Sequence, residues 1–153
     1  MMERSLTLVG FEQSDTGIDD RVINGAELLL GVQFPSGYRR IALAFDGAFG
    51  DLDFPLPGTG RRAQASIGHW LSLIPWRSSS VWSWLACWGE HQLPRAVIPI
   101  AENGGGDLLC LDYRSGSEPS LCFWFHELGE DGLYPVAESF DSWLRTAIEP
   151  ALS

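Results

Sequence analysis

The sequence predicts a single domain in which helices occupy the first half and strands most of the second. A chain of 153 residues has the length of one domain, and its 45% apolar and 20% charged residues are typical of a globular protein rather than a disordered one. Apolar residues recur at helical spacing in the first ninety residues, and the spacing becomes that of strands from Ala96 onward. We therefore treat residues 1–153 as one domain.

The first helix is expected after the candidate N-caps Asp15, Thr16 and Asp19, and Gly31 is placed to end it. Its apolar stripe comprises Ile18, Val22, Ala26, Leu29 and Leu30. A second helix is expected between residues 34–36 and 46–47, and the residues on its apolar face are Tyr38, Ile41, Ala42 and Phe45.

The middle of the chain is less regular. Residues 47–62 are rich in glycine and proline and predict a loop with a short strand, whereas residues 64–74 carry a helical pattern that Pro75 ends. Another helix is expected within residues 78–94, with one of the serines at 78–80 as its cap. The shared face of that helix is formed by Val81, Trp84, Leu85 and Trp88.

Three strand-like runs follow, at residues 97–101, 107–113 and 120–127. Both faces of the last two runs are apolar, which predicts central strands that are covered on each side. A last helix is expected over residues 138–148 and is ended by Pro150. Its core-facing residues are Phe140, Trp143, Leu144 and Ala147.

A hairpin is expected to join the last two strands. A turn centred on Gly116 places Arg114 opposite Glu118, and this favourable pairing selects the register over its one-residue neighbours. The same register places Cys110 opposite Cys122, and we expect the two thiols to stay reduced.

Composition excludes several classes of function. All ten basic residues are arginine, so the chain has no lysine for a Walker A loop, a Schiff base or the usual protein-kinase nucleotide site. The net charge of −10 disfavours direct binding to nucleic acid or an anionic membrane and favours a basic protein partner, although the same charge also serves solubility. There is no C-x-x-C spacing, no signal-peptide apolar region and no apolar run near ~18 residues, so we expect a reduced, cytoplasmic protein without metal or cofactor.

Motifs for chemistry are weak. Residues 58–63 match a dinucleotide-binding string, but no strand precedes them, and we interpret them as a loop. Glu102, Asp107 and Asp112 flank a triple glycine and would suit a divalent cation if they met in space. A structural turn is the simpler interpretation of these glycines, because glycine tolerates the positive φ that such turns require.

Five of the seven tryptophans fall between residues 70 and 88. Trp84 and Trp88 lie on the apolar stripe and are expected in the core, whereas Trp76 and Trp82 lie off it and are candidates for an aromatic binding surface. For Trp82 exposure and packing are evenly balanced, and for Trp76 packing is favoured.

Five segments occur in an order that matches a known family. They are ELLLGVQFPSGY (27–38), FDG (45–47), IPIAENGGGDLLCLD (98–112), SLCFWFHE (120–127) and YPVAESFDSWL (134–144). Over residues 18–148 this combination resembles the SUKH superfamily, which includes the fungal cell-wall assembly regulator and many bacterial immunity proteins. The chain departs from the pattern at Asp46, where asparagine is commoner, at Trp143, where phenylalanine is, and over residues 58–95.

The resemblance implies a single α+β domain, with helices packed against a curved, mainly antiparallel sheet, and no catalysis. It also implies that the motif residues hold the fold, and these are Glu27, Gly31, Pro35, Tyr38, Gly47, Gly106, Asp107 and Asp112. Bacterial members often bind and block a toxin domain, frequently a nuclease. The first hypothesis is therefore an immunity protein whose candidate partner-binding residues are Trp76, Trp82, Asp51 and Asp53.

Two other hypotheses remain open. One is a regulatory scaffold of the fungal-regulator type with several weak partners, and the other is a metal-dependent enzyme that uses Glu102, Asp107 and Asp112. The identity of a toxin, the surface that binds it and the oligomeric state do not follow from the sequence.

Overall fold

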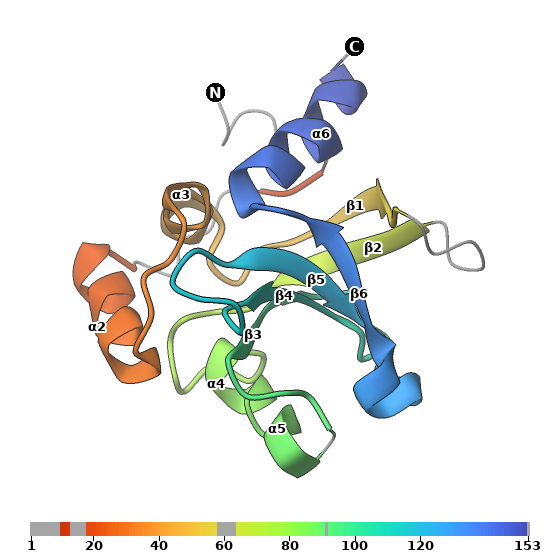
Figure 1. Ribbon diagram of the computed structural model, residues 1–153. Coiled ribbons are helices and arrows are strands. Elements are labelled where there is room, and N and C mark those ends of the chain that lie inside the picture. Colours follow the sequence, from red (N-terminus) through yellow and green to blue (C-terminus); the bar gives the residue numbers. More distant parts are fainter. Residues whose placement is uncertain (1–9, 13–17, 58–63, 91, 153) are drawn as a thin grey trace.

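The computed structural model describes residues 10–12, 18–57, 64–90 and 92–152. Within these ranges six strands form one antiparallel sheet in the order β1-β2-β3-β4-β5-β6 (Figure 1). The strands are β1 (Phe49–Pro55), β2 (Gln64–Trp70), β3 (Val97–Glu102), β4 (Leu108–Asp112), β5 (Ser120–Trp124) and β6 (Leu133–Ala137). The helices are α2 (Asp20–Leu30), α3 (Ser36–Phe45), α4 (Val81–Trp84), α5 (Cys87–Glu90), α6 (Phe140–Leu152) and the 3-10 helix η1 (His126–Gly132). This arrangement confirms the α+β class.

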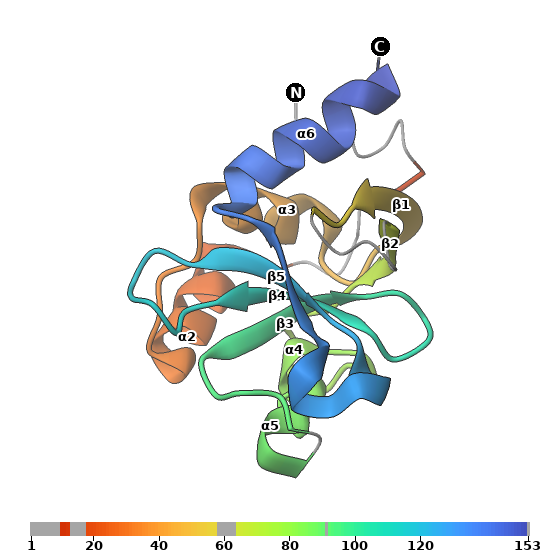
Figure 2. The ribbon, with the colours of Figure 1, turned by 45° about the vertical axis from the view of Figure 1, so that its right-hand side comes forward.

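The central strands are buried on both faces, as their sequence predicts. Leu109 and Leu111 of β4 belong to the larger core, which includes buried residues of α2, α3 and α6. Leu108 and Cys110, which alternate with them, belong to a smaller core that is covered by residues 84–93. Figure 2 shows α3 and α6 on one side of the strands and α4 and α5 on the other. Side-chain alternation along one strand therefore builds two separate cores.

Helix α2 begins and ends where its sequence predicts. The Asp19 side chain accepts hydrogen bonds from the backbone N–H groups of Arg21 and Val22, and Gly31 takes the left-handed conformation with φ of 70°. The predicted stripe is wrong at Leu29, which is 75% exposed, because the helix packs through Ile23 and Ala26 instead.

Two predicted helices in the middle of the chain are wrong. Residues 64–70 form the strand β2 rather than a helix. Burial alternates from Gln64 to His69, as in a pleated strand, and these residues pair with β1. The helix expected within residues 78–94 is replaced by two short helices, α4 and α5, which residues 85–86 separate. Trp88 and Gly89 inside α5 also leave the helical conformation. Ser80 does cap α4, through a reciprocal capping box with Ser83.

The closing helix α6 is capped by Ser139, whose Oγ accepts from the N–H of Ser142 at 3.1 Å. The helix continues to Leu152, so the expectation that Pro150 ends it is wrong. A proline near a helix terminus removes one N–H from the hydrogen-bond ladder, and that loss is smaller there than in the helix interior.

The hairpin register is confirmed, since Cys110 pairs with Cys122 across β4 and β5. The two thiols are free and buried, and burial raises the pKa of Cys110, with Cys122 adding to the shift. The register was chosen from an expected pairing of Arg114 with Glu118. In the structure Arg114 forms its ion pair with Asp112 instead, at 2.7 Å. Asp112 is the last residue of β4 and Arg114 lies in the turn that follows, so this ion pair is local.

Gly37 marks a close approach between α3 and α6. A Cβ at this position would collide with Oδ1 of Asp141 and lie 3.3 Å from Cδ1 of Phe140. Tyr38, the next residue, is buried and packs edge-on against Phe140 at a centroid distance of 5.8 Å. The absence of a side chain at Gly37 therefore lets the two helices meet.

We expect Gly37→Ala to lower the free energy of unfolding by about 1–3 kcal/mol, because the added methyl group forces α3 and α6 apart. Gly25→Ala is the matched control, since Gly25 also lies in a helix and a Cβ there would meet nothing within 4 Å. That control should be neutral or stabilising by up to about 1 kcal/mol. Chemical denaturation measures both, and equal stability of the two variants would contradict the packing at Gly37.

Candidate binding groove

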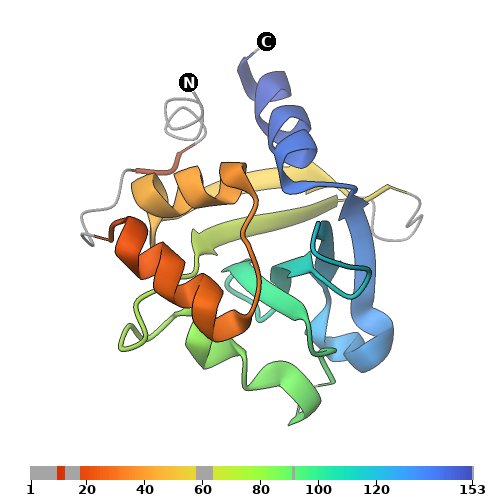
Figure 3. The same cartoon turned by 60° about the vertical axis from the view of Figure 1, so that its left-hand side comes forward.

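A large hollow lies between α2 and the β4–β5 hairpin. It has a volume of about 860 Å³, and Figure 3 views this side of the molecule with α2 and its linker to α3 in front. Its apolar wall consists of Leu28, Leu30, Val32, Trp88, Ala96, Ile98 and Tyr113. We call this space the apolar hollow.

A second hollow of about 320 Å³ lies against the N-terminal ends of α3 and α6. Residues 33–36, 117–119 and 139–141 line it, and they include the carboxylates of Glu118 and Asp141. We call this space the acidic hollow. Gln33 and Ser117 line both hollows, so the two spaces are neighbours.

The hairpin is tied to the α2–α3 linker by one hydrogen bond. The hydroxyl of Tyr113 donates to the carbonyl oxygen of Gln33 at 2.7 Å. Burial raises the pKa of Tyr113, and the negative charges of Glu27 and Glu118 raise it further. The hydroxyl therefore remains a proton donor at any physiological pH, and the two walls of the groove stay joined.

Trp88 forms part of the wall of the apolar hollow. Its Nε1–H donates to the carbonyl oxygen of Val97 at 2.9 Å, and the guanidinium of Arg95 lies 5.6 Å from its ring centroid. The indole is half-buried, so one part of the ring packs on the core while another part lines the groove. The hydrogen bond fixes which part faces outward.

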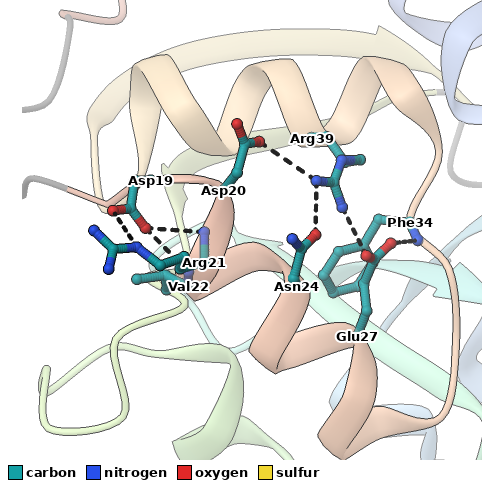
Figure 4. Close-up of polar contacts among 8 residues, drawn as sticks. All are labelled: Asp19, Asp20, Arg21, Val22, Asn24, Glu27, Phe34 and Arg39. Atoms are coloured by element: carbon teal, nitrogen blue, oxygen red, sulfur yellow. Dashed lines mark hydrogen bonds and ion pairs between the residues drawn. The ribbon is translucent and has the colours of Figure 1, made fainter.

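Glu27 holds the corner between α2 and α3 (Figure 4). Its two oxygens accept hydrogen bonds from the N–H of Phe34 and from Nη1 of Arg39, each at 2.6 Å. Arg39 also contacts the side chains of Asn24 at 3.0 Å and Asp20 at 3.4 Å. Both carboxylate oxygens of Glu27 are thus engaged within the fold, which agrees with a structural role for this motif residue.

Other motif residues also hold turns. Gly31, Gly47 and Gly106 have φ values of 70°, 74° and 99°, which side chains rarely adopt. Pro35 directly precedes the first residue of α3. The carboxylate of Asp107 accepts from the side-chain amide of Asn103 and from the backbone and ring of His126, and so joins the β3–β4 turn to the end of β5.

The metal-site hypothesis is contradicted. Glu102 lies 3.3 Å from His69, Asp107 binds His126, and Asp112 binds Arg114. Burial alone would raise the pKa of Asp112, but the hydrogen bonds and charge of Arg114 hold it below its ordinary value. In the part of the chain that the structure describes, no group of three His, Cys, Asp or Glu side chains could hold a metal ion. Separate cross-strand and turn partners keep the three carboxylates apart.

The predicted partner-binding residues lie outside the groove. Trp76 is 83% exposed, so the expectation that it packs is wrong. Trp82 is half-buried, packs against the larger core and donates from Nε1 to the carbonyl oxygen of Leu73 at 2.8 Å. Asp51 and Asp53 are exposed on the edge strand β1. The dinucleotide-like string at 58–63 lies outside the described residues.

The groove itself was missed by the sequence reasoning. Its walls come from four segments that are far apart in the chain. The sequence places most of the apolar residues of these walls in a core or gives them no role. The one available signal was Leu28, which lies off the predicted stripe of α2 and is 83% exposed.

Comparison with known proteins gives two findings. The model of the SMI1/KNR4 family (SUKH-1) matches residues 17–146 of the chain. A stretch of 62 residues, or 39% of the chain, is 32% identical to the SPbeta prophage-derived uncharacterized protein YokK of Bacillus subtilis (strain 168). That match covers 31% of the length of the relative. In the described residues, no helix has both the length and the apolar character that crossing a membrane requires.

We expect Glu27→Ala to lower the free energy of unfolding by about 2–4 kcal/mol, because it leaves the Phe34 N–H and the Arg39 guanidinium without their acceptor. Asp20→Ala removes the other carboxylate near Arg39 and is the control. The Asp20 side chain is 72% exposed, so this change should cost less than about 0.5 kcal/mol. Urea denaturation of both variants checks the prediction, which fails if the two costs are the same.

Proposed function

Because the chain belongs to the SMI1/KNR4 family (SUKH-1), we propose that it is a non-catalytic protein-binding domain. More specifically, we propose an immunity protein that binds and neutralises a bacterial toxin domain in the cytoplasm. The observation that carries this proposal is the groove, which combines a large apolar wall with polar groups that already serve the fold.

The state of these polar groups favours binding over catalysis. A general base or nucleophile needs a free lone pair directed at a substrate. In the apolar hollow, however, both oxygens of Glu27 accept hydrogen bonds within the fold, and the hydroxyl proton of Tyr113 is committed to Gln33. Leu28 in the apolar wall has no such internal use, since it is 83% exposed, and exposed apolar surface marks interaction sites.

Charge supports a basic partner. The chain carries a net charge of −10, and a field of this sign accelerates association with a positively charged protein. Many nucleases are positively charged where they contact phosphate, and an acidic inhibitor is complementary to such a surface. The resemblance to a prophage-derived protein also places one relative in a phage-derived setting.

The direct test is capture of the tagged protein from the cells that encode it, followed by co-expression. We expect one stoichiometric partner with a toxin domain, and we expect co-expression of this chain to restore growth of cells that produce the toxin. Several substoichiometric partners without any protection from toxicity would instead support a regulatory scaffold and reject the immunity role.

We expect reversal of charge on β1 to slow association with the captured partner. Asp51→Lys combined with Asp53→Lys should reduce the association rate constant about tenfold at low ionic strength, with a smaller effect at high salt. Asp51→Glu combined with Asp53→Glu keeps the charge and is the control. Stopped-flow or surface-binding kinetics measures both, and an unchanged rate at low salt would show that these acids do not steer the partner.

A further inference from the structure

We infer that the apolar and acidic hollows form one groove for an extended basic segment of the partner, with an apolar side chain beside Leu28 and Trp88 and an arginine or lysine beside Glu118. This inference rests on the proposed function and deepens it, since it names the surface that binds and the chemistry that it recognises. Three features of the molecule support it: the two hollows are adjacent, the first exposes an apolar side chain, and the second is acidic.

The two hollows share the linker and the hairpin as walls. Gln33 on the linker and Ser117 on the hairpin line both hollows, and Gly31 and Gly116 line the apolar hollow without side chains. A channel with walls of this kind accommodates an extended chain better than a helix, because backbone can approach small residues closely.

The apolar hollow has exposure that the fold does not use. Leu28 is 83% exposed although it stands next to the half-buried Leu30, Val32 and Trp88. Covering such a side chain with an apolar group of a partner is favourable by about 25 cal/mol per Å² of buried surface. This end of the groove therefore suits an aliphatic or aromatic side chain.

The acidic hollow determines the charge of the occupant. The residues that line the two hollows include three carboxylates, Glu27, Glu118 and Asp141, and no basic side chain. Arg39 compensates Glu27, whereas Glu118 has no ion pair among the described residues. Asp141 accepts one long hydrogen bond of 3.3 Å from Ser36 at Oδ2, and its Oδ1 is buried, so Glu118 is the exposed carboxylate at this end of the groove. A cationic side chain would lower the energy of these charges, while an acidic segment or a second copy with charge −10 would be repelled.

The test uses short synthetic peptides, titrated into the full ¹⁵N-labelled chain and followed by NMR. The probes are N-acetyl-Leu-Gly-Arg-amide and its forms with two or three glycines, and the controls replace arginine by glutamate or leucine by alanine. We expect at least one arginine peptide to shift the backbone amides of Gln33, Ser117 and Glu118, with a dissociation constant at least about fivefold below that of its glutamate form. Shifts outside the groove, equal affinity for both charges, or no binding at millimolar peptide would each overturn the inference.

Two pairs of exposed residues supply matched variants. Leu28→Ala should weaken the peptide about fivefold, whereas Leu29→Ala should not, since Leu29 is 75% exposed but does not line the groove. Glu118→Gln should weaken the arginine peptide about threefold, whereas Glu127→Gln, at an exposed acid on η1, should have no effect. Equal effects within either pair would reject the groove as the binding site.

The outcomes separate this inference from the proposed function. If the chain protects cells from a toxin but Leu28→Ala and Glu118→Gln bind that toxin normally, the inference fails and the immunity role stands. If the peptides bind in the groove as described but no toxin is captured and no protection is found, the immunity role fails and the groove chemistry stands.

Discussion

Burial of β3, β4 and β5 on both faces is the constraint on which the rest of this structure depends. Three central strands without a polar face need apolar cover on each side. Helices α2, α3 and α6 supply it on one side and residues 84–93 on the other. The groove lies where these two layers of cover do not meet, between α2, Trp88 and the β4–β5 hairpin. The groove is thus a consequence of how the sheet is covered.

The carboxylates of this acidic chain divide into two populations. Some accept hydrogen bonds from backbone N–H groups and fix turns, as Glu27 does for Phe34, and Asp46 for Leu73 at 2.7 Å. Others are exposed and make no such bonds among the described residues, such as Asp51, Asp53 and Glu118. In the first population a charged acceptor strengthens the hydrogen bonds that hold a chain reversal. The second population provides the field that a basic partner would meet.

Several side chains with chemical potential serve packing or turn geometry. His69 lies beside Glu102 and stacks on the exposed ring of Phe49 with a centroid distance of 4.1 Å. The ring of His126 forms a hydrogen bond with the carboxylate of Asp107. The three cysteines share one small core, where burial keeps Cys110 protonated. The contacts of these residues thus lie within the fold.

The sequence by itself determined the elements whose signals are local. Asp19 and Gly31 mark the two ends of α2, because a cap and a left-handed glycine act within one helix turn. The apolar runs identified β4 and β5, because the side chains of a single strand alternate between its two faces. The family motifs likewise identified turns and caps. Only the tertiary structure decided that residues 64–70 form a strand, since pairing with β1 outweighs an ambiguous period, and that Trp76 is exposed. It also decided the groove, because Leu28, Gln33, Trp88 and Ser117 meet through long-range packing that no local pattern records.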